Sequence, residues 1–181
     1  MADISLAPDD ISYGAAISAC GKRGKWEQAL KLLSRMPEMR VASDIITHCA
    51  AISACGQAGE WKASCTLLIK MADAKLAPHE ISCNAAISAC EKMGVWQMGL
   101  SLLSEMPQLS VTPGVVSLSA AISACEKGAQ WQQALSLLRV MPEKRVRANQ
   151  ISYNAAISAC EAGMQLDMGL ELLLEAREMG E

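Results

Sequence analysis

A six-residue sequence that recurs five times constrains the fold of this chain more than any other feature. The sequence Ala-Ala-Ile-Ser-Ala-Cys is repeated unchanged, and each copy begins 35 residues after the previous one. The five copies end at Cys20, Cys55, Cys90, Cys125 and Cys160. Self-similarity at a fixed period of about 20–50 residues is typical of solenoids, in which each unit packs only on its neighbours. The sequence therefore predicts an array of repeated units.

The 35-residue register extends over nearly the whole chain. The predicted repeats are residues 10–44, 45–79, 80–114 and 115–149, followed by a truncated repeat at residues 150–181. Residues 1–9 resemble the tail of a preceding repeat, because Leu6-Ala7-Pro8-Asp9 is parallel to Leu76-Ala77-Pro78-His79. We therefore expect the chain to be a fragment of a longer array.

Each repeat is predicted to form a helix, a turn and a second helix. In the first helix, Tyr13, Ile17 and Cys20 fall on one face at helical spacing and form an apolar stripe. The second helix begins at Trp26 and is expected to end where prolines stop it, at Pro37, Pro107 and Pro142 in their respective repeats. A glycine separates the two helices, at Gly24, Gly59 and Gly94, and one place earlier at Gly128 and Gly163. The last two turns are therefore expected to differ slightly from the others.

Two more apolar columns keep the register and are expected in the core. They are Trp26, Trp61, Trp96 and Trp131 with Leu166, and Met36, Met71, Met106 and Met141 with Ala176. Aromatic residues make up only 3% of the chain and there is no Phe, which favours packed helices over a β sandwich. The predicted fold is all-α, a right-handed α-solenoid of about five helix-turn-helix repeats with ten helices.

Composition and charge narrow the range of functions. The chain carries 16 Lys and Arg against 19 Asp and Glu, so it lacks the strongly basic character usual in nucleic-acid binders, although a local stripe could serve. No apolar run approaches the roughly 18–20 residues that cross a bilayer, and no membrane partner is expected. The sequence holds no Gly-rich phosphate loop, no paired carboxylates on a common helix face and no deaminase-type zinc motif. We expect neither an enzyme nor a bound cofactor.

The eight cysteines have two interpretations. None forms a Cys-x-x-Cys pair, so the usual zinc spacings are missing, and the five periodic cysteines fall on the apolar stripe as small hydrophobic residues. The alternative is a metal held by one face of two adjacent first helices, through His48, Cys55, Cys83 and Cys90. We favour core cysteines and expect no metal, because each of these ligands would have to leave the core.

The repeated unit resembles a known family. The segments Ile-Ser-Tyr-Asn-Ala-Ala-Ile-Ser-Ala-Cys (151–160) and Gln-Ala-Leu-Ser-Leu-Leu-Arg-Val-Met (133–141) are similar to the pentatricopeptide repeat family, as a P-type array of 35-residue repeats. A tetratricopeptide repeat differs, because its period is 34 residues and its Trp lies in the first helix, whereas Trp26 opens the second. The resemblance implies single-stranded RNA binding with one base per repeat, in RNA processing, stability or translation. It also implies a mitochondrial or chloroplast location, although no targeting peptide is visible in the sequence.

Variation among the copies indicates where a repeat binder would hold its specificity. One variable column faces the apolar side of the first helix and consists of Tyr13, His48, Cys83, Leu118 and Tyr153. The other is expected on the opposite, exposed and concave face and consists of Gly14, Cys49, Asn84, Ser119 and Asn154. The resemblance implies that this second column reads the base edge together with the last residue of each repeat, at Asp44, His79, Gly114 and Asn149. It also implies that bases are sandwiched by Ile11, Ile46, Ile81, Val116 and Ile151.

The resemblance assigns these pairs unevenly to bases. Ser119 with Asn149 is similar to the adenine-selecting pair, since a hydroxyl and an amide satisfy the donor and acceptor edge of adenine. Asn84 favours a pyrimidine, but its partner Gly114 has no side chain to complete the recognition. In the first repeat, Gly14 with Asp44 keeps only the acidic group and weakly favours guanine. In the second repeat, Cys49 with His79 fits no known pairing. We therefore expect poor sequence selectivity.

Lysines recur near the end of the first helix, at Lys22, Lys92 and Lys127. They would contact about three phosphates of a single strand, which predicts binding that is lost in moderate salt. The alternative is that they are solvated lysines favoured by the helix dipole.

Two functions remain after these arguments. The first is RNA binding by a monomeric part of a longer pentatricopeptide array. The second is a helical scaffold that binds a peptide or protein partner on the same concave face. Low basicity and incomplete base-reading pairs favour the scaffold, and the family resemblance with its variable column favours RNA.

Overall fold

The structure, a computed structural model, describes residues 9–178, and these residues form ten α-helices and no strand. The helices are α1 (Asp10–Lys22), α2 (Trp26–Arg35), α3 (Ile45–Ala58), α4 (Trp61–Asp73), α5 (Glu80–Lys92), α6 (Trp96–Glu105), α7 (Val115–Lys127), α8 (Trp131–Glu143), α9 (Gln150–Ala162) and α10 (Leu166–Glu178). The predicted all-α repeat solenoid is confirmed. Residues 1–8 of the predicted tail lie outside the described residues. Among the described helices, none is both long and apolar enough to cross a membrane.

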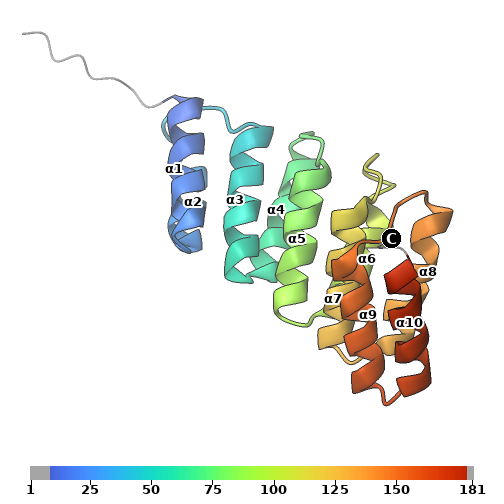
Figure 1. The fold of residues 1–181 in the computed structure, drawn as a ribbon. Helices are drawn as coiled ribbons and strands as arrows, with labels where there is room; N and C mark the ends of the chain where they lie inside the picture. The colour runs from blue at the N-terminus through green and yellow to red at the C-terminus, as the bar shows by residue number, and fades with distance from the viewer. Residues whose placement is uncertain (1–8, 179–181) are drawn as a thin grey trace, which may run out of the picture.

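The helices form two layers (Figure 1). The first helices of the repeats, α1, α3, α5, α7 and α9, lie side by side and each packs on the next. Each of α2, α4, α6 and α8 packs against the first helix of its own repeat and against the first helix of the following repeat. Every tertiary contact between described helices therefore joins the same or adjacent repeats, as expected for a solenoid.

The repeated six-residue sequence forms the interface between successive first helices. In α3, Ala51, Ile52 and Cys55 are fully buried, and the alanines allow neighbouring helices to approach closely. A Cβ atom placed on Gly56 would lie only 2.5 Å from the carbonyl oxygen of Ala85 on α5. Since interiors are packed at crystal-like density, a larger side chain at Gly56 would force α3 and α5 apart.

The two predicted core columns differ in burial. All four methionines, Met36, Met71, Met106 and Met141, are fully buried, which confirms their core position. The prediction that the tryptophans are core residues is only half right, because all four are half-buried. Each opens a second helix in the outer layer. The rings of Trp96 and Trp131 lie against the backbone of the following repeat, at Gly128 and Gly163, where a Cβ atom would overlap them.

The turns between the two helices keep one backbone conformation in all five repeats. The residue two places before the start of the second helix has a positive φ in every repeat. These residues are Gly24, Gly59, Gly94, Ala129 and Met164. The expected difference in the last two turns is therefore a difference in sequence and not in backbone. Glycine moves one place earlier there because it leaves room for the tryptophan ring of the preceding repeat.

The ends of the second helices repeat as well. After Met36, the N–H of Val41 donates to the Met36 carbonyl at 2.9 Å, with Arg40 in the left-handed region at φ 60°. This is the bonding of a Schellman motif. The equivalent left-handed residues in the next three repeats are Lys75, Ser110 and Arg145. The expected end of the second helix near these prolines is confirmed, since α2 ends at Arg35, α6 at Glu105 and α8 at Glu143, one residue after Pro142.

Candidate nucleic-acid interface

A column of large aliphatic side chains is exposed on the layer of first helices. It consists of Ile11, Ile46, Ile81, Val116 and Ile151, the residues predicted to sandwich bases, and their exposed fractions range from 52% to 75%. Each is the second residue of its helix, so the column repeats once per repeat. Exposed aliphatic residues at one position in every repeat mark a surface suited to binding. We call the surface around this column the first-helix face.

A cavity of about 340 Å³ lies between the first two members of this column. Its lining includes Ile11 and Ile46, together with Gly14 and Asp44, the predicted base-reading pair of the first repeat. The other polar residues of the lining are Asp10, Ser18 and Thr47. The structure thus brings the predicted sandwiching and base-reading residues of this repeat around one space.

The two base-reading columns also meet in space in the second and fourth repeats. Cys49 Sγ lies 3.7 Å from His79 Nε2, and Ser119 Oγ lies 3.4 Å from Asn149 Oδ1, although 30 residues separate the members of each pair. Asn149 and Asn154 both line a cavity of about 750 Å³ between α9 and the end of α10. Each pair therefore joins the start of one first helix to the residue that precedes the next.

The expectation that the second variable column is exposed is wrong for two of its members. Cys49 and Ser119 are only 8% and 5% exposed, whereas Asn154 is exposed and Gly14 and Asn84 are half-buried. The following first helix covers them: Ser119 Oγ lies 2.7 Å from Ser152 Oγ on α9. The hydroxyl predicted to read adenine is thus already hydrogen-bonded within the protein.

The last residues of the repeats also cap the following first helices, a function that the sequence reading missed. Asp44 accepts from the N–H of Thr47 at 2.8 Å, Asn149 caps α9 and His79 caps α5. Burial opposes ionisation of Asp44, but the hydrogen bonds from the Thr47 N–H and hydroxyl outweigh it and hold its pKa below the usual value. A Ser or Thr three residues after each cap, as in a capping box, was the available signal.

Two of the three predicted phosphate-binding lysines are engaged within the protein. Lys92 Nζ donates to the carbonyl oxygen of Gln57 at 2.6 Å. Lys127 Nζ lies 3.6 Å from Glu91 Oε1. Both contacts join adjacent repeats, so these lysines stabilise the stacking of first helices. Lys22 makes no ion pair with any residue that the structure describes.

The cysteines are free thiols, and most are buried. No three His, Cys, Asp or Glu side chains among residues 9–178 lie close enough to hold a metal ion, so His48, Cys55, Cys83 and Cys90 do not form such a group. Burial also raises the pKa of Cys55 to about 11, which disfavours the thiolate that a metal would need.

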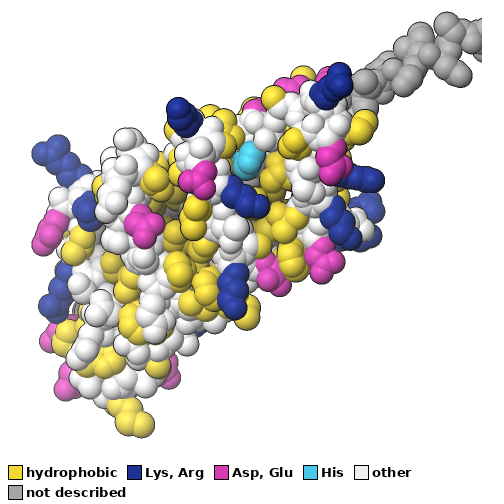
Figure 2. Space-filling view, turned by 180° about the vertical axis from the view of Figure 1, so that it is seen from behind, with side chains coloured by type: hydrophobic (Ala, Val, Ile, Leu, Met, Phe, Trp, Pro, Cys, Tyr) yellow, Lys and Arg dark blue, Asp and Glu magenta, His cyan; other side chains and the backbone are white. Residues whose placement is uncertain are grey.

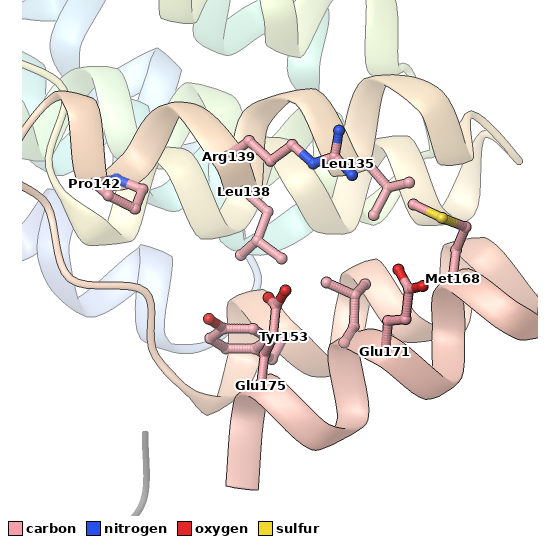
Figure 3. Close-up of a pocket in the computed structure, with 9 residues that line it drawn as sticks. Leu135, Leu138, Arg139, Pro142, Tyr153, Met168, Glu171 and Glu175 are labelled. Carbon is pink, nitrogen blue, oxygen red and sulfur yellow. The ribbon is translucent and has the colours of Figure 1, made fainter. Parts of the chain in front are cut away.

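Further cavities lie between second helices. Seen from behind, hydrophobic side chains run between the helices while lysines and arginines stand out from the surface (Figure 2). One cavity of about 240 Å³ separates α8 from α9 and α10, with Arg139 on one side and Glu171 and Glu175 on the other (Figure 3). Burial and the Glu175 carboxylate raise the pKa of Tyr153 in its wall. This cavity contains none of the aliphatic column and is separate from the first-helix face.

The fold and the first-helix face define a helical-repeat protein with one exposed aliphatic residue per repeat on a common face. A PPR repeat family model matches residues 8–57, and a pentatricopeptide repeat domain model matches residues 101–162. A PPR repeat model matches residues 46–76, 81–111 and 151–181. The chain belongs to the pentatricopeptide repeat family. No curated protein matches it.

Solved structures share the fold at low sequence identity. The pentatricopeptide repeat protein PPR10 from maize is 23% identical with a TM-score of 0.76, over 97% of this chain and 25% of that one. PPR10 in complex with an 18-nt psaJ RNA element is 20% identical, with a TM-score of 0.73, over 98% and 30% of the two chains. The PPR domain of Arabidopsis thaliana protein-only RNase P 1, in complex with tRNA, is 15% identical with a TM-score of 0.80, over 95% and 91%. This chain therefore spans about a quarter of the PPR10 chain.

Proposed function

We propose that this chain binds single-stranded RNA along its first-helix face, with one base per repeat held between successive members of the aliphatic column. The cavity of about 340 Å³ between Ile11 and Ile46 is the observation that carries this proposal. We further propose a role in RNA processing, stability or translation in a mitochondrion or chloroplast, which rests on the family alone.

The chemistry of the cavity suits a nucleobase. Two aliphatic walls cover the apolar faces of a flat ring, and the Asp44 carboxylate meets its polar edge. Single-strand binders commonly combine such stacking with contacts to base edges. PPR10 and the PPR domain of RNase P 1, which share this fold, have been crystallised with RNA, and this supports the proposal.

The charges of this face predict weak, salt-sensitive binding. Each phosphate contact contributes a slope of roughly −0.7 to the dependence of log affinity on log salt for single strands. Lys92 donates one of its three N–H groups to the Gln57 carbonyl oxygen, and the Glu91 carboxylate beside Lys127 offsets part of the charge of that lysine. Affinity should therefore depend mainly on base stacking, which makes the aliphatic column the place to test.

The first test replaces Ile46 with Ala and compares it with Ile69→Ala. Both isoleucines are strongly exposed, at 71% and 63%, but Ile69 is on the second helix α4. We expect Ile46→Ala to weaken binding of a mixed single-stranded RNA pool by about fivefold, because about 1 kcal/mol of apolar contact is lost. Ile69→Ala should leave affinity unchanged. The measurement is a filter-binding titration at low salt.

A scaffold for a peptide or protein remains the second candidate, and one observation favours it. The Glu91 carboxylate offsets part of the positive charge of Lys127 on the first-helix face, while the aliphatic column of this face fits apolar side chains equally well. If the wild-type chain binds no single-stranded RNA at low salt, RNA binding is overturned. Equal losses for Ile46→Ala and Ile69→Ala would place RNA elsewhere on the molecule.

A further inference from the structure

The third repeat lacks one of its two base-reading side chains. Its pair is Asn84 and Gly114, and Gly114 contributes no side chain. Gly114 is also the residue before α7, where it makes no side-chain cap. Its φ of −102° is open to any residue, so backbone conformation does not require glycine there.

The carboxylate of Glu80 occupies the space that a side chain at position 114 would fill. A Cβ atom placed on Gly114 would lie 2.8 Å from Glu80 Oε1. Glu80 is the first residue of α5, one turn before Asn84, and Asn84 Nδ2 lies 3.5 Å from the same Oε1. The glycine thus allows a carboxylate from the neighbouring helix to stand beside the base-reading asparagine.

The remaining polar atom of Asn84 has no partner. Its Oδ1 is buried and accepts no hydrogen bond from any residue that the structure describes. An unsatisfied buried carbonyl costs free energy, and a ligand that donates a hydrogen bond removes this cost. Ile81, a member of the exposed aliphatic column, is on the same turn of α5 and completes the site.

We propose that Glu80 is the second base-reading residue of the third repeat and selects bases that carry an imino N–H, uracil or guanine. This inference rests on the RNA binding proposed above. An ionised carboxylate and the Asn84 Oδ1 atom are both hydrogen-bond acceptors. Uracil and guanine offer an N–H donor at the centre of their pairing edge, whereas cytosine and adenine present a lone pair there. The Glu80 carboxylate therefore accepts the imino N–H of uracil or guanine and is repelled by the ring-nitrogen lone pair of cytosine and adenine. Guanine also carries an amino group beside its imino N–H, so it can donate to both acceptors.

The arrangement is specific to this repeat. The residues equivalent to Glu80 in the other repeats are Asp10, Ile45, Val115 and Gln150. Three of them carry no carboxylate, and the repeat of Asp10 already has an acidic last residue, Asp44. Glycine at the end of a repeat and glutamate at its start occur together only in the third repeat.

The test is selection of RNA from a randomised single-stranded pool by the whole chain, followed by sequencing of the bound RNA. We expect one nucleotide at which uracil and guanine exceed cytosine and adenine by about fivefold or more, as for a good pair of edge contacts. Glu80→Gln should abolish this preference, because an amide can also donate to a ring nitrogen. The double variant Glu80→Ala with Gly114→Asp should restore it by supplying a carboxylate from position 114.

The matched control is Glu105→Gln in the same repeat. Glu105 is an exposed residue on α6, where it accepts from Ser101, and its replacement removes the same charge away from the first-helix face. This control should keep the wild-type preference, and circular dichroism should show that all variants are folded. If the wild-type chain binds the pool but Glu80→Gln leaves the preference unchanged, this inference fails and RNA binding stands. If the wild-type chain binds no RNA, both fail.

Discussion

At the residue scale, the cysteines differ in the pKa of their thiols. Burial raises the pKa of Cys55 and Cys125 to about 11, since an apolar core disfavours the thiolate. Cys65 on α4 is half-buried and lies beside Cys90 on α5. A hydrogen bond from the Cys90 thiol lowers the pKa of Cys65, and the same pairing raises the pKa of Cys90. Neighbouring thiols therefore differ in reactivity.

This difference predicts the order of alkylation. Because the thiolate is the nucleophile, Cys65 should react with iodoacetamide well before Cys55 and Cys125 in the folded chain. Mass spectrometry of digested peptides after timed labelling at mildly alkaline pH measures the order. Labelling in denaturant is the control, in which all three should react at similar rates. Equal rates in the folded chain would contradict the burial described above.

The sequence predicted which residues vary, but not which of them are reachable. The helical period placed Ser119 opposite the apolar stripe, and on an isolated helix that side would face water. The next first helix approaches closely enough to cover it, since Ser119 Oγ lies 2.7 Å from Ser152 Oγ on α9. Helical periodicity predicts on which side of a helix a residue lies, but it does not predict the distance between two packed helices. The proximity of Glu80 to Gly114 could not be predicted for the same reason, since the two residues are distant in sequence.

At the scale of helices, the start of each first helix depends on the last residue of the preceding repeat. Asp44, His79 and Asn149 provide side-chain caps, while Gly114 provides none. The sequence located these residues through a family resemblance to RNA readers. In the structure, their side chains cap the first turn of the following helix. Replacing them therefore alters both the stability of that helix and the first-helix face.

Replacing Asp44 with Ala should produce a pH-dependent loss of stability. The pKa of Asp44 is lowered in the folded chain, so its stabilising effect is complete above the unfolded value and is lost as pH falls through the folded value. We expect a loss of about 0.5–2 kcal/mol near neutral pH, as for other N-caps. The loss should shrink at pH values below about 3.9, the pKa of an unperturbed Asp.

Urea unfolding across this pH range measures the effect. Asn149→Ala is the matched control, because Asn149 caps α9 through an amide that does not titrate. Its loss of stability should not follow the carboxylate titration. A loss for Asp44→Ala that stays constant from neutral to acid pH would show that the cap does not depend on ionisation.

At the scale of the whole molecule, stability depends on how many neighbours a repeat has. In a linear array, an internal repeat shares two interfaces. Leu103 on α6 is only 8% exposed, whereas Leu173, at the same repeat position on α10, is 55% exposed. The period and the two-helix unit could be predicted from the sequence. The partial exposure of Trp96 could not, because it depends on how far the outer layer stands from the next repeat.

Truncation of these two leucines should have unequal effects. Leu103→Ala should cost about 2–5 kcal/mol, as for a buried large-to-small change. Leu173→Ala should cost less than about 1 kcal/mol, because most of its surface is already in contact with solvent. Equilibrium unfolding in urea measures both. Equal losses would be inconsistent with a stacked array in which α10 has an exposed outer side.

The unchanged six-residue sequence has a consequence for how such a chain can vary in length. Since all five first helices offer the same alanine, isoleucine and cysteine side chains to one another, any repeat is a chemically acceptable neighbour for any other. Loss of residues 80–114 would bring the second repeat against the fourth through side chains that already pack together in the intact chain. Gene duplication or deletion can therefore change the span of the binding surface in whole steps, without a new interface having to evolve.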